Sequence, residues 1–319
     1  MSAVLGEAAP SPTVDPRLSS EHAGRRLAEE ERLEARIRNG AIDFLDGDKW
    51  YSVHTAIRGV LHMTGLYRRG QANAERITVR ENIVRSPLVP AGFDGFTLLQ
   101  ISDLHVELHP GAMRRLIGMV GDLDYDGTVL TGDYRARTHG PFDASLDAVA
   151  ALCARLRGPV WGILGNHDSL RMVPRLEATG IRILLNEWTP IVRGGDRICL
   201  AGVDDEADYA AADIERAAAG IPSDVFAILL SHTPATYREA AAAGFSLLLA
   251  GHTHGGQVCL PGGVPLTLAS PGLPRRLGAG AWRYGAMDGY TSRGVGCSGV
   301  DVRFNCPPEI TLHRLARTT

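Results

Sequence analysis

The segment GILGNHDSL, residues 162–170, runs from apolar residues directly into Asn166, His167 and Asp168. These side chains can ligate a metal ion, donate a proton and carry charge, and they are costly to leave unpaired at the end of a buried strand. Four further apolar runs end in residues of the same kinds. The four clusters are Asp103-Leu104-His105, Gly132-Asp133, Ser231-His232 and Gly251-His252-Thr253-His254-Gly255.

Each cluster also has an ordinary interpretation. A single Asp-x-His, Gly-Asp or Ser-His at a strand end is typical of a turn, a cap or a satisfied core histidine. GNHD and GHTHGG are more specific, and five ordered clusters at the ends of apolar runs indicate one shared site.

Asp168 aside, the clusters together offer two carboxylates, one amide and four or five imidazoles, without a cysteine. Mixed nitrogen and oxygen ligands suit Mn²⁺, Fe or Zn²⁺ better than Ca²⁺ or Mg²⁺. In extended chain, residues two apart point the same way, so Asp103 with His105, and His252 with His254, can each reach one place. Seven ligands are too many for one ion and suffice for two if one carboxylate bridges. The flanking glycines permit close backbone approach beside the ions.

The elements that must position these residues form an alternating pattern. Apolar runs at 96–103, 127–133, 159–166, 197–205, 225–232 and 245–252 alternate with expected helices near 111–121, 142–157, 209–219 and 234–243. This alternation predicts an α/β domain, and continuous apolar runs fit strands buried on both faces. Function gathers at the carboxyl ends of such strands, so we expect the clusters to meet in space.

Composition narrows the class of protein. The 319 residues are 45% hydrophobic and 22% charged, with a net charge of −3, which excludes the basic field of a nonspecific nucleic-acid binder. The five cysteines are scattered, with no C-x-x-C pair, which favours a reducing compartment. No apolar stretch approaches the roughly 20 residues that span a bilayer. We expect a cytoplasmic protein that binds no nucleic acid.

The N-terminal quarter differs from the rest. We expect a disordered tail over 1–20, a helical N-terminal extension over 21–90, and the catalytic domain over 91–319. Alternating charges predict an exposed helix over 21–38 that Asn39-Gly40 would terminate. Residues 50–67 predict an amphipathic helix, which either packs on the main domain or lies on the inner face of an anionic membrane. Its apolar face carries Trp50, Val53, Ile57, Val60 and Leu61, and Arg58, His62 and Arg69 lie on another face.

The ordered clusters resemble the blocks of the calcineurin-like metallophosphoesterase family, over about residues 95 to 315. The resemblance implies a four-layer αββα sandwich with a dinuclear metal site. One ion would take Asp103, His105 and His254, and the other Asn166, His232 and His252. Asp133 would bridge the two ions, with Mn²⁺ as the expected metal and Fe or Zn²⁺ as alternatives.

The resemblance also implies a reaction. A hydroxide bridging the ions would attack phosphorus during in-line displacement. His167 would stabilise the developing charge and protonate the leaving oxygen, and Asp168 would hold the His167 imidazole in orientation. The coloured iron site of purple acid phosphatases is disfavoured, because Ala136 stands where those enzymes have a tyrosine.

Three arginines are candidates to bind substrate phosphate: Arg135, Arg293 and Arg303. The alternative for each is a surface arginine or one paired with a carboxylate such as Asp301. Asp204 and Asp205 also follow an apolar run, and we place them in the loop or around the ligands because no metal position is left for them.

The C-terminal segment resembles a bacterial branch that contains small phosphodiesterases and the UDP-2,3-diacylglucosamine diphosphatases of lipid A synthesis. A nucleotide-lipid substrate would explain the amphipathic helix over 50–67. The alternatives are a soluble phosphodiesterase, a phosphomonoesterase and a scaffold that has lost catalysis. The complete ligand set and His167 argue against the scaffold.

Overall fold

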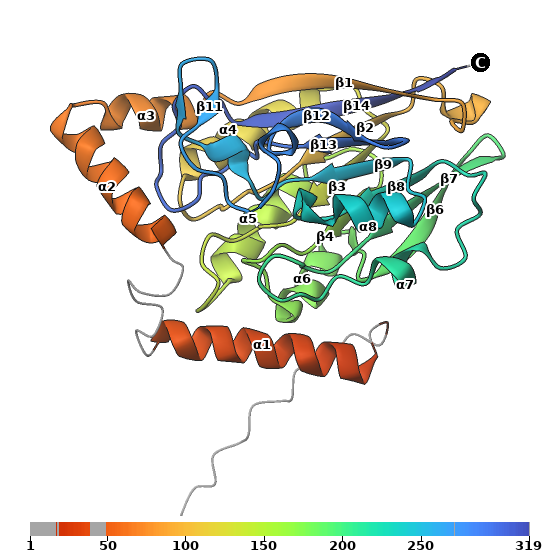
Figure 1. Ribbon diagram of the computed structural model, residues 1–319, viewed down its shortest axis with the longest axis horizontal. Coiled ribbons are helices and arrows are strands. Elements are labelled where there is room, and N and C mark those ends of the chain that lie inside the picture. The colour runs from red at the N-terminus through yellow and green to blue at the C-terminus, as the bar shows by residue number, and fades with distance from the viewer. Residues whose placement is uncertain (1–16, 18, 39–48, 271, 319) are drawn as a thin grey trace, which may run out of the picture.

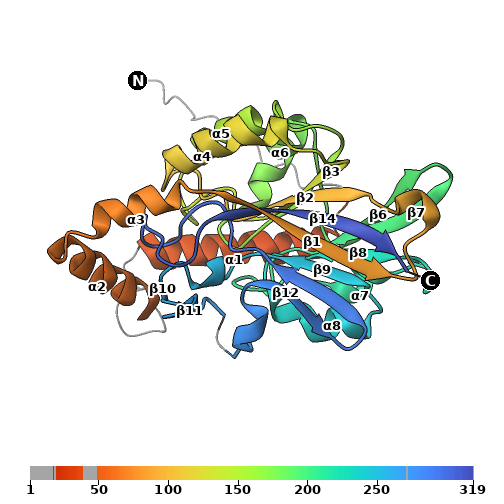
Figure 2. The same cartoon turned by 90° about the horizontal axis from the view of Figure 1, so that it is seen from above.

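Two six-stranded sheets stacked face to face form the centre of the molecule (Figures 1 and 2). The computed structural model describes residue 17 and residues 19–38, 49–270 and 272–318. The first sheet has the order β1 (Thr78–Ser86), β14 (Glu309–Arg317), β2 (Thr97–Ile101), β3 (Gly127–Thr131), β4 (Val160–Ile163) and β5 (Ile181–Ile183). The second has the order β12 (Gly280–Tyr284), β13 (Met287–Thr291), β9 (Leu247–Ala250), β8 (Ala227–Leu230), β7 (Asp196–Gly202) and β6 (Glu187–Arg193). A small ribbon pairs β10 (Cys259–Leu260) with β11 (Val264–Pro265).

Helices cover the outer face of each sheet, as Figure 2 shows from above. The first sheet carries α4 (Pro110–Met119), α5 (Asp143–Cys153) and α6 (Val173–Ala178). The second carries α7 (Ile214–Ala218) and α8 (Tyr237–Ala242). The predicted four-layer αββα sandwich is therefore confirmed.

The central strands are apolar throughout because both of their faces are buried. In β2, Leu98 points into the core between the two sheets, and its neighbour Leu99 points into the core beneath the helices. In β9, Leu247 and Leu248 divide in the same way between the inner core and the α7–α8 side. Each such side chain stabilises the fold by about 1.5–3 kcal/mol through burial, which fixes the strand ends that carry the polar clusters.

All six predicted strands are present, as β2, β3, β4, β7, β8 and β9. The parallel core pairs β2 with β3, β3 with β4, and β7 with β8 and β8 with β9. The remaining strands of the two sheets were not predicted. The edge strands β1, β5, β6 and β12 are short or alternate with exposed polar residues. The next strands inward, β13 and β14, are paired on both sides but carry polar residues among the apolar ones.

The extension expected to be helical over 21–90 contains a strand. Helices α1 (Ser20–Arg38), α2 (Lys49–Met63) and α3 (Tyr67–Ala74) are followed by β1, which pairs in parallel with β14 at the margin of the first sheet. The alternation of β1 places Val84 inside and Ile83 outside, so the helical assignment of 78–86 was wrong. Most of the expected tail, and the Asn39-Gly40 terminator, lie outside the described residues.

Helix α1 is not the exposed helix that we expected. His22, Ala23, Arg26 and Glu30 form one buried stripe along it. Charge alternation missed this stripe because its buried members are mainly polar and are paired with one another and with the catalytic domain.

The amphipathic segment forms two helices rather than one, because Gly65 adopts a left-handed φ of 71° between α2 and α3. Leu61 packs with Val300 and Val302 of the main domain, whereas Val60 is exposed. The side chains of Trp50 and Val53 lie outside those that the structure describes. Among the described helices, none is long and apolar enough to cross a membrane.

Candidate metal centre

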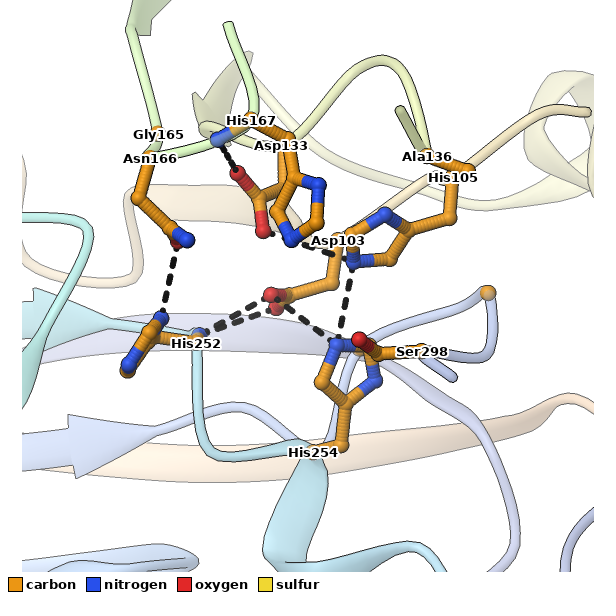
Figure 3. A network of polar contacts seen from close by, with 12 residues as sticks. Asp103, His105, Asp133, Ala136, Gly165, Asn166, His167, His252, His254 and Ser298 are labelled. Carbon is orange, nitrogen blue, oxygen red and sulfur yellow. Dashed lines mark hydrogen bonds and ion pairs between the residues drawn. The ribbon is translucent and has the colours of Figure 1, made fainter. Parts of the chain in front are cut away.

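The predicted ligands meet where five strands end. Asp103 and His105 follow β2, Asp133 follows β3 and Asn166 follows β4 in the first sheet; His232 follows β8, and His252 and His254 follow β9 in the second. Figure 3 shows Asp103, Asp133, His105 and His254 pointing toward one another. The structure thus brings all seven predicted ligands together at one edge of the sandwich.

The backbone at these strand ends is strained. Asp103, His105, Asp133, His252 and His254 have φ values of 52°, 40°, 58°, 67° and 50°. Non-glycine residues in this left-handed region cost about 1–3 kcal/mol each and persist where the surrounding structure imposes them, commonly at functional sites. The paired ligands therefore converge as we expected, but through sharp left-handed turns and not through extended chain.

Two groups of donor atoms share one carboxylate. In the first group, His105 Nε2 lies 3.1 Å from His254 Nε2, and His254 Nε2 lies 3.5 Å from Asp103 Oδ1. In the second, Asn166 Oδ1 lies 3.1 Å from His232 Nε2 and 3.0 Å from His252 Nδ1.

Asp133 Oδ2 lies between these groups, 3.4 Å from His105 Nε2 and 3.2 Å from His232 Nε2. Of the two carboxylates, Asp133 is the one that lies beside ring nitrogens of both groups, as a bridging carboxylate must.

The donor set fits divalent cations. His105 Nδ1 lies 3.1 Å from the Arg135 carbonyl, and His232 Nδ1 lies 2.8 Å from the Thr131 carbonyl. A carbonyl only accepts, so each Nδ1 donates, and each Nε2 is left as the ring nitrogen that faces the centre, the usual arrangement of a metal-binding histidine. Ring nitrogens and ligand oxygens that face one another at these distances repel, and a cation bound among them removes the repulsion.

Burial sets the charge of the ligands. It lowers the pKa of His105 and of His252 to about 3, so both imidazoles are neutral and able to ligate near neutral pH. It raises the pKa of Asp103 to about 6. Burial would also raise the pKa of Asp133, but His232 and the neighbouring imidazoles hold that pKa well below its usual value.

Glycine is required where the loops touch. Gly132 has a φ of 87°, and a methyl group on it would lie 2.6 Å from the Gly165 nitrogen and 2.9 Å from His232 Nδ1. A methyl group on Gly165 would collide with the Asp133 carboxylate. The expected close backbone approach beside the ligands is confirmed at both positions.

Asp168 does not orient His167, and that prediction was wrong. Its Oδ2 accepts from the backbone N–H of Asp133 at 2.8 Å and of Gly165 at 2.9 Å, and its Oδ1 accepts from that of Tyr134 at 3.0 Å. With its oxygens on backbone donors, the Asp168 carboxylate ties the loop after β3 to the loop after β4.

His167 lies beside the donor groups. Its ring meets that of His105 edge to face, with centroids 4.9 Å apart, and its backbone N–H donates to Asp133 Oδ1 at 2.9 Å. Among the described residues, its buried Nδ1 has no hydrogen-bond partner. A ring nitrogen of His167 also lies close enough to His105 and Asp133 to complete a metal-binding group. Its role as a proton donor stays a prediction.

Two of the three candidate arginines are buried and bonded to backbone carbonyls. Arg135 donates to the carbonyls of Thr138, Gly140 and His167. Arg303 donates to carbonyls that include that of Gly296, and its Nη2 lies 3.3 Å from His254 Nδ1. Both act as backbone braces, so their assignment to substrate was wrong. Arg293 keeps 26% of its side chain exposed and is ion-paired with Glu309, not Asp301.

Sequence reasoning missed Asp208. Its Oδ2 accepts from Asn166 Nδ2 at 2.9 Å, which turns Asn166 Oδ1 toward His232 and His252. Asp208 is itself held by its backbone N–H, which donates to Asp205 Oδ2 at 2.8 Å. The run of acidic residues after β7 was the available signal, and Asp205 confirms the expectation that these residues lie around the ligands rather than among them.

Comparison with known proteins agrees with this geometry. Residues 96–256, which make up half of the chain, match the model of the calcineurin-like phosphoesterase family. The chain belongs to this family of metal-dependent phosphoesterases, and it is a hydrolase.

Relatives of this chain carry the same description. It is 29% identical over 254 residues to the uncharacterized metallophosphoesterase YkuE of Bacillus subtilis, covering 76% of this chain and 86% of that protein. It is 29% identical over 238 residues to the phosphodiesterase YaeI of Escherichia coli, covering 69% of this chain and 82% of YaeI. A transmembrane protein with a metallophosphoesterase domain from Danio rerio is 29% identical over 242 residues, which are 70% of this chain and 54% of that protein.

Among solved structures, the phosphopantetheinyl hydrolase of Mycobacterium tuberculosis aligns with a TM-score of 0.39 at 12% identity. The alignment covers 62% of this chain and 89% of that one.

Proposed function

We propose that this protein hydrolyses phosphodiester or pyrophosphate bonds with two divalent ions, of which Mn²⁺ is the first candidate. Asp103, His105 and His254 hold one ion, Asn166, His232 and His252 hold the other, and Asp133 joins them. The observation that carries the proposal is the position of Asp133 Oδ2 within 3.4 Å of His105 and 3.2 Å of His232, which belong to different groups.

When bound, two such ions supply an activated water as nucleophile and neutralise the phosphoryl oxygens. The protein residues divide the remaining work. Asp168 keeps the loops after β3 and β4 in register through backbone hydrogen bonds. His167 has its side chain beside the shared carboxylate, where it holds a proton for the departing oxygen.

The charge around the site favours a diester over a monoester. A phosphomonoester carries two negative charges on one phosphoryl group and calls for further cationic contacts, whereas a phosphodiester, and each phosphoryl group of a disubstituted pyrophosphate, carries only one. Arg135 and Arg303, the buried candidates, are occupied by carbonyls, and Arg293 is neutralised by Glu309. The phosphodiesterase activity in the name of the YaeI relative agrees with this preference.

The corner between α2 and α3 supports a substrate with acyl chains. Val60, Met63 and Leu66 are 52%, 82% and 40% exposed there, and Arg68 and Arg69 of α3 are exposed beside them. Exposed apolar side chains flanked by basic ones are typical of a segment that meets an anionic membrane surface.

This corner is also linked to the metal centre. The Arg303 N–H donates to the Gly70 carbonyl of α3 at 3.0 Å, and the Arg303 side chain contacts His254. UDP-2,3-diacylglucosamine, a nucleotide lipid with a pyrophosphate, is therefore the first specific substrate that we propose, with peripheral contact to the inner face of the membrane. A soluble phosphodiester is the second.

The test starts from metal-stripped protein with Mn²⁺ added back. Bis-p-nitrophenyl phosphate is compared with p-nitrophenyl phosphate and with UDP-2,3-diacylglucosamine in micelles. We expect turnover of the diester and of the nucleotide lipid to exceed that of the monoester. Preferential turnover of the monoester would overturn the diester assignment, and turnover of none with Mn²⁺, Fe²⁺ or Zn²⁺ would favour the scaffold.

The membrane contact has its own control. Met63→Ser removes an exposed apolar side chain from the α2–α3 corner, and Val192→Ser removes one from β6, where Val192 is 66% exposed. We expect only Met63→Ser to weaken binding to vesicles of anionic phospholipid and to slow nucleotide-lipid hydrolysis. Equal behaviour of the two variants would contradict a role of the corner at the membrane.

A further inference from the structure

Helix α1 is attached to the catalytic domain by buried charges. Arg26 is 2% exposed, and its Nη1 lies 2.8 Å from Glu30 Oε1 while its Nε lies 3.4 Å from Asp204 Oδ1. The guanidinium also stacks over the Tyr209 ring, 3.2 Å from its centroid. In Figure 1, α1 lies along the lower side of the molecule, below α6 and α7.

One set of contacts from this cluster holds the loop that carries Asn166 and His167. Arg26 Nη2 donates to the Asp168 carbonyl at 3.1 Å. Glu30 accepts from the Leu170 backbone N–H at 2.9 Å and from the Ser169 hydroxyl. The backbone immediately after His167 is thus fixed by two side chains of α1.

A second set of contacts runs from the same cluster to the Asn166 side chain. His22 Nε2 lies 3.0 Å from Asp204 Oδ2, so α1 grips this carboxylate with two residues. Asp204 Oδ1 accepts from the Asp205 N–H at 2.8 Å, Asp205 accepts from the Asp208 N–H, and Asp208 accepts from the Asn166 amide. The first set of contacts therefore holds the backbone two to four residues after Asn166, and the second reaches the Asn166 side chain itself.

We propose that Arg26 is a positioning residue for the metal centre, because it fixes the loop of Asn166 from α1. A buried ion pair adds little stability compared with apolar packing of the same volume, so attachment alone does not explain why charge occupies this interface. What the charges add is direction: the guanidinium fork reaches Glu30, Asp204 and the Asp168 carbonyl at fixed angles. The metal part of this proposal rests on the proposed function, whereas the ordering of the loop does not.

The test compares Arg26→Met with Arg25→Met, a matched control because Arg25 is the exposed neighbour on the same helix. Amide hydrogen exchange is measured on the metal-free full chain, and Mn²⁺ binding by equilibrium dialysis. For Arg26→Met we expect residues 165–170 to exchange at least tenfold faster while β8 and β9 exchange as in the wild type. We expect Mn²⁺ affinity to fall by up to about tenfold, the lower end of the range for groups that bond a metal ligand directly, because Arg26 acts through the loop and not on a ligand. Arg25→Met should match the wild type in both measurements.

Wild-type exchange over 165–170 together with wild-type Mn²⁺ affinity in Arg26→Met would overturn the proposal. If Arg26→Met does not fold, the neutral triple variant Arg26→Met, Glu30→Gln, Asp204→Asn removes the unpaired charges and the same criteria apply to it. A fall in protection that includes β8 and β9 would show a merely structural role. Neither readout measures hydrolysis, so the role of Arg26 can be judged even if the proposed hydrolytic activity is not found.

Discussion

Removing the Asp208 carboxylate should weaken one ion site without disturbing the fold. Asp208 Oδ2 takes one Asn166 amide hydrogen at 2.9 Å, and Asn166 Oδ1 then faces His232 Nε2 at 3.1 Å and His252 Nδ1 at 3.0 Å. Without that acceptor the amide is free to rotate, and its NH₂ group can point at the position that the oxygen should occupy. An NH₂ group offers no lone pair to a metal.

The magnitude follows from this one contact. A hydrogen bond to a charged group contributes about 1.5–3 kcal/mol, and the lower end applies because Asp208 is exposed. At about 1.4 kcal/mol for each factor of ten, Asp208→Ala should weaken the site of Asn166, His232 and His252 by about tenfold, and Asp208→Asn by less. The assay is Mn²⁺ binding followed by equilibrium dialysis, with thermal unfolding as the check on the fold.

Glu206→Ala is the matched control, because it removes an acidic residue from the same loop, and no described hydrogen bond joins Glu206 to a predicted ligand. We expect Glu206→Ala to bind Mn²⁺ as the wild type does. Unchanged affinity in Asp208→Ala, or an equal loss in both variants, would refute the reasoning that Asp208 orients Asn166.

Three further variants test other parts of the structure. His167→Ala should retain its Mn²⁺ content and lower kcat by about 10²- to 10⁴-fold, less for a p-nitrophenolate leaving group than for an alcohol; loss of Mn²⁺ would make His167 a ligand. Gly165→Ala should lower Mn²⁺ affinity, since its methyl group would meet Asp133, and wild-type affinity would disprove that collision. Burial lowers the pKa of His313 to about 3, so the unfolded chain binds the additional proton and stability should fall as the pH drops below about 6.5, by about 1.4 kcal/mol for each unit. Urea unfolding between pH 5 and 7 should show a shallower slope for His313→Gln, and equal slopes would contradict this account.

The sequence made the central sheets and the ligand set predictable for the same physical reason. Strands buried on both faces need unbroken apolar runs, and polar side chains at their ends stand out against those runs. The strands outside this apolar centre escaped this reasoning. β14, for example, reads Glu-Ile-Thr-Leu-His-Arg-Leu-Ala-Arg, in which buried Glu309, Thr311 and His313 alternate with apolar residues. His313 is satisfied there by Gln100 Oε1 at 2.9 Å and Asn82 Nδ2 at 3.0 Å, partners that lie 213 and 231 residues away.

The burial of charged residues is the other feature that the local sequence does not reveal. Arg26 and Glu30 stand four residues apart, a spacing typical of a solvated helical ion pair. Nothing in the local sequence distinguishes that pair from one that is buried against Asp204 and Ser169. The partners that decide it lie 178 and 139 residues further along the chain.

Asp168 shows that a motif can identify a residue without revealing what it acts on. Its position beside His167 suggested a carboxylate that orients an imidazole. The structure instead places its oxygens on the amides of Gly165, Asp133 and Tyr134. These amides belong to loops that follow neighbouring parallel strands, and β3 and β4 hold those loops close enough for one carboxylate to reach both. Asp168 therefore holds Asp133 through its backbone N–H, and Asn166 through the N–H of the preceding Gly165, so the spacing of two loops, rather than the tilt of one ring, depends on it.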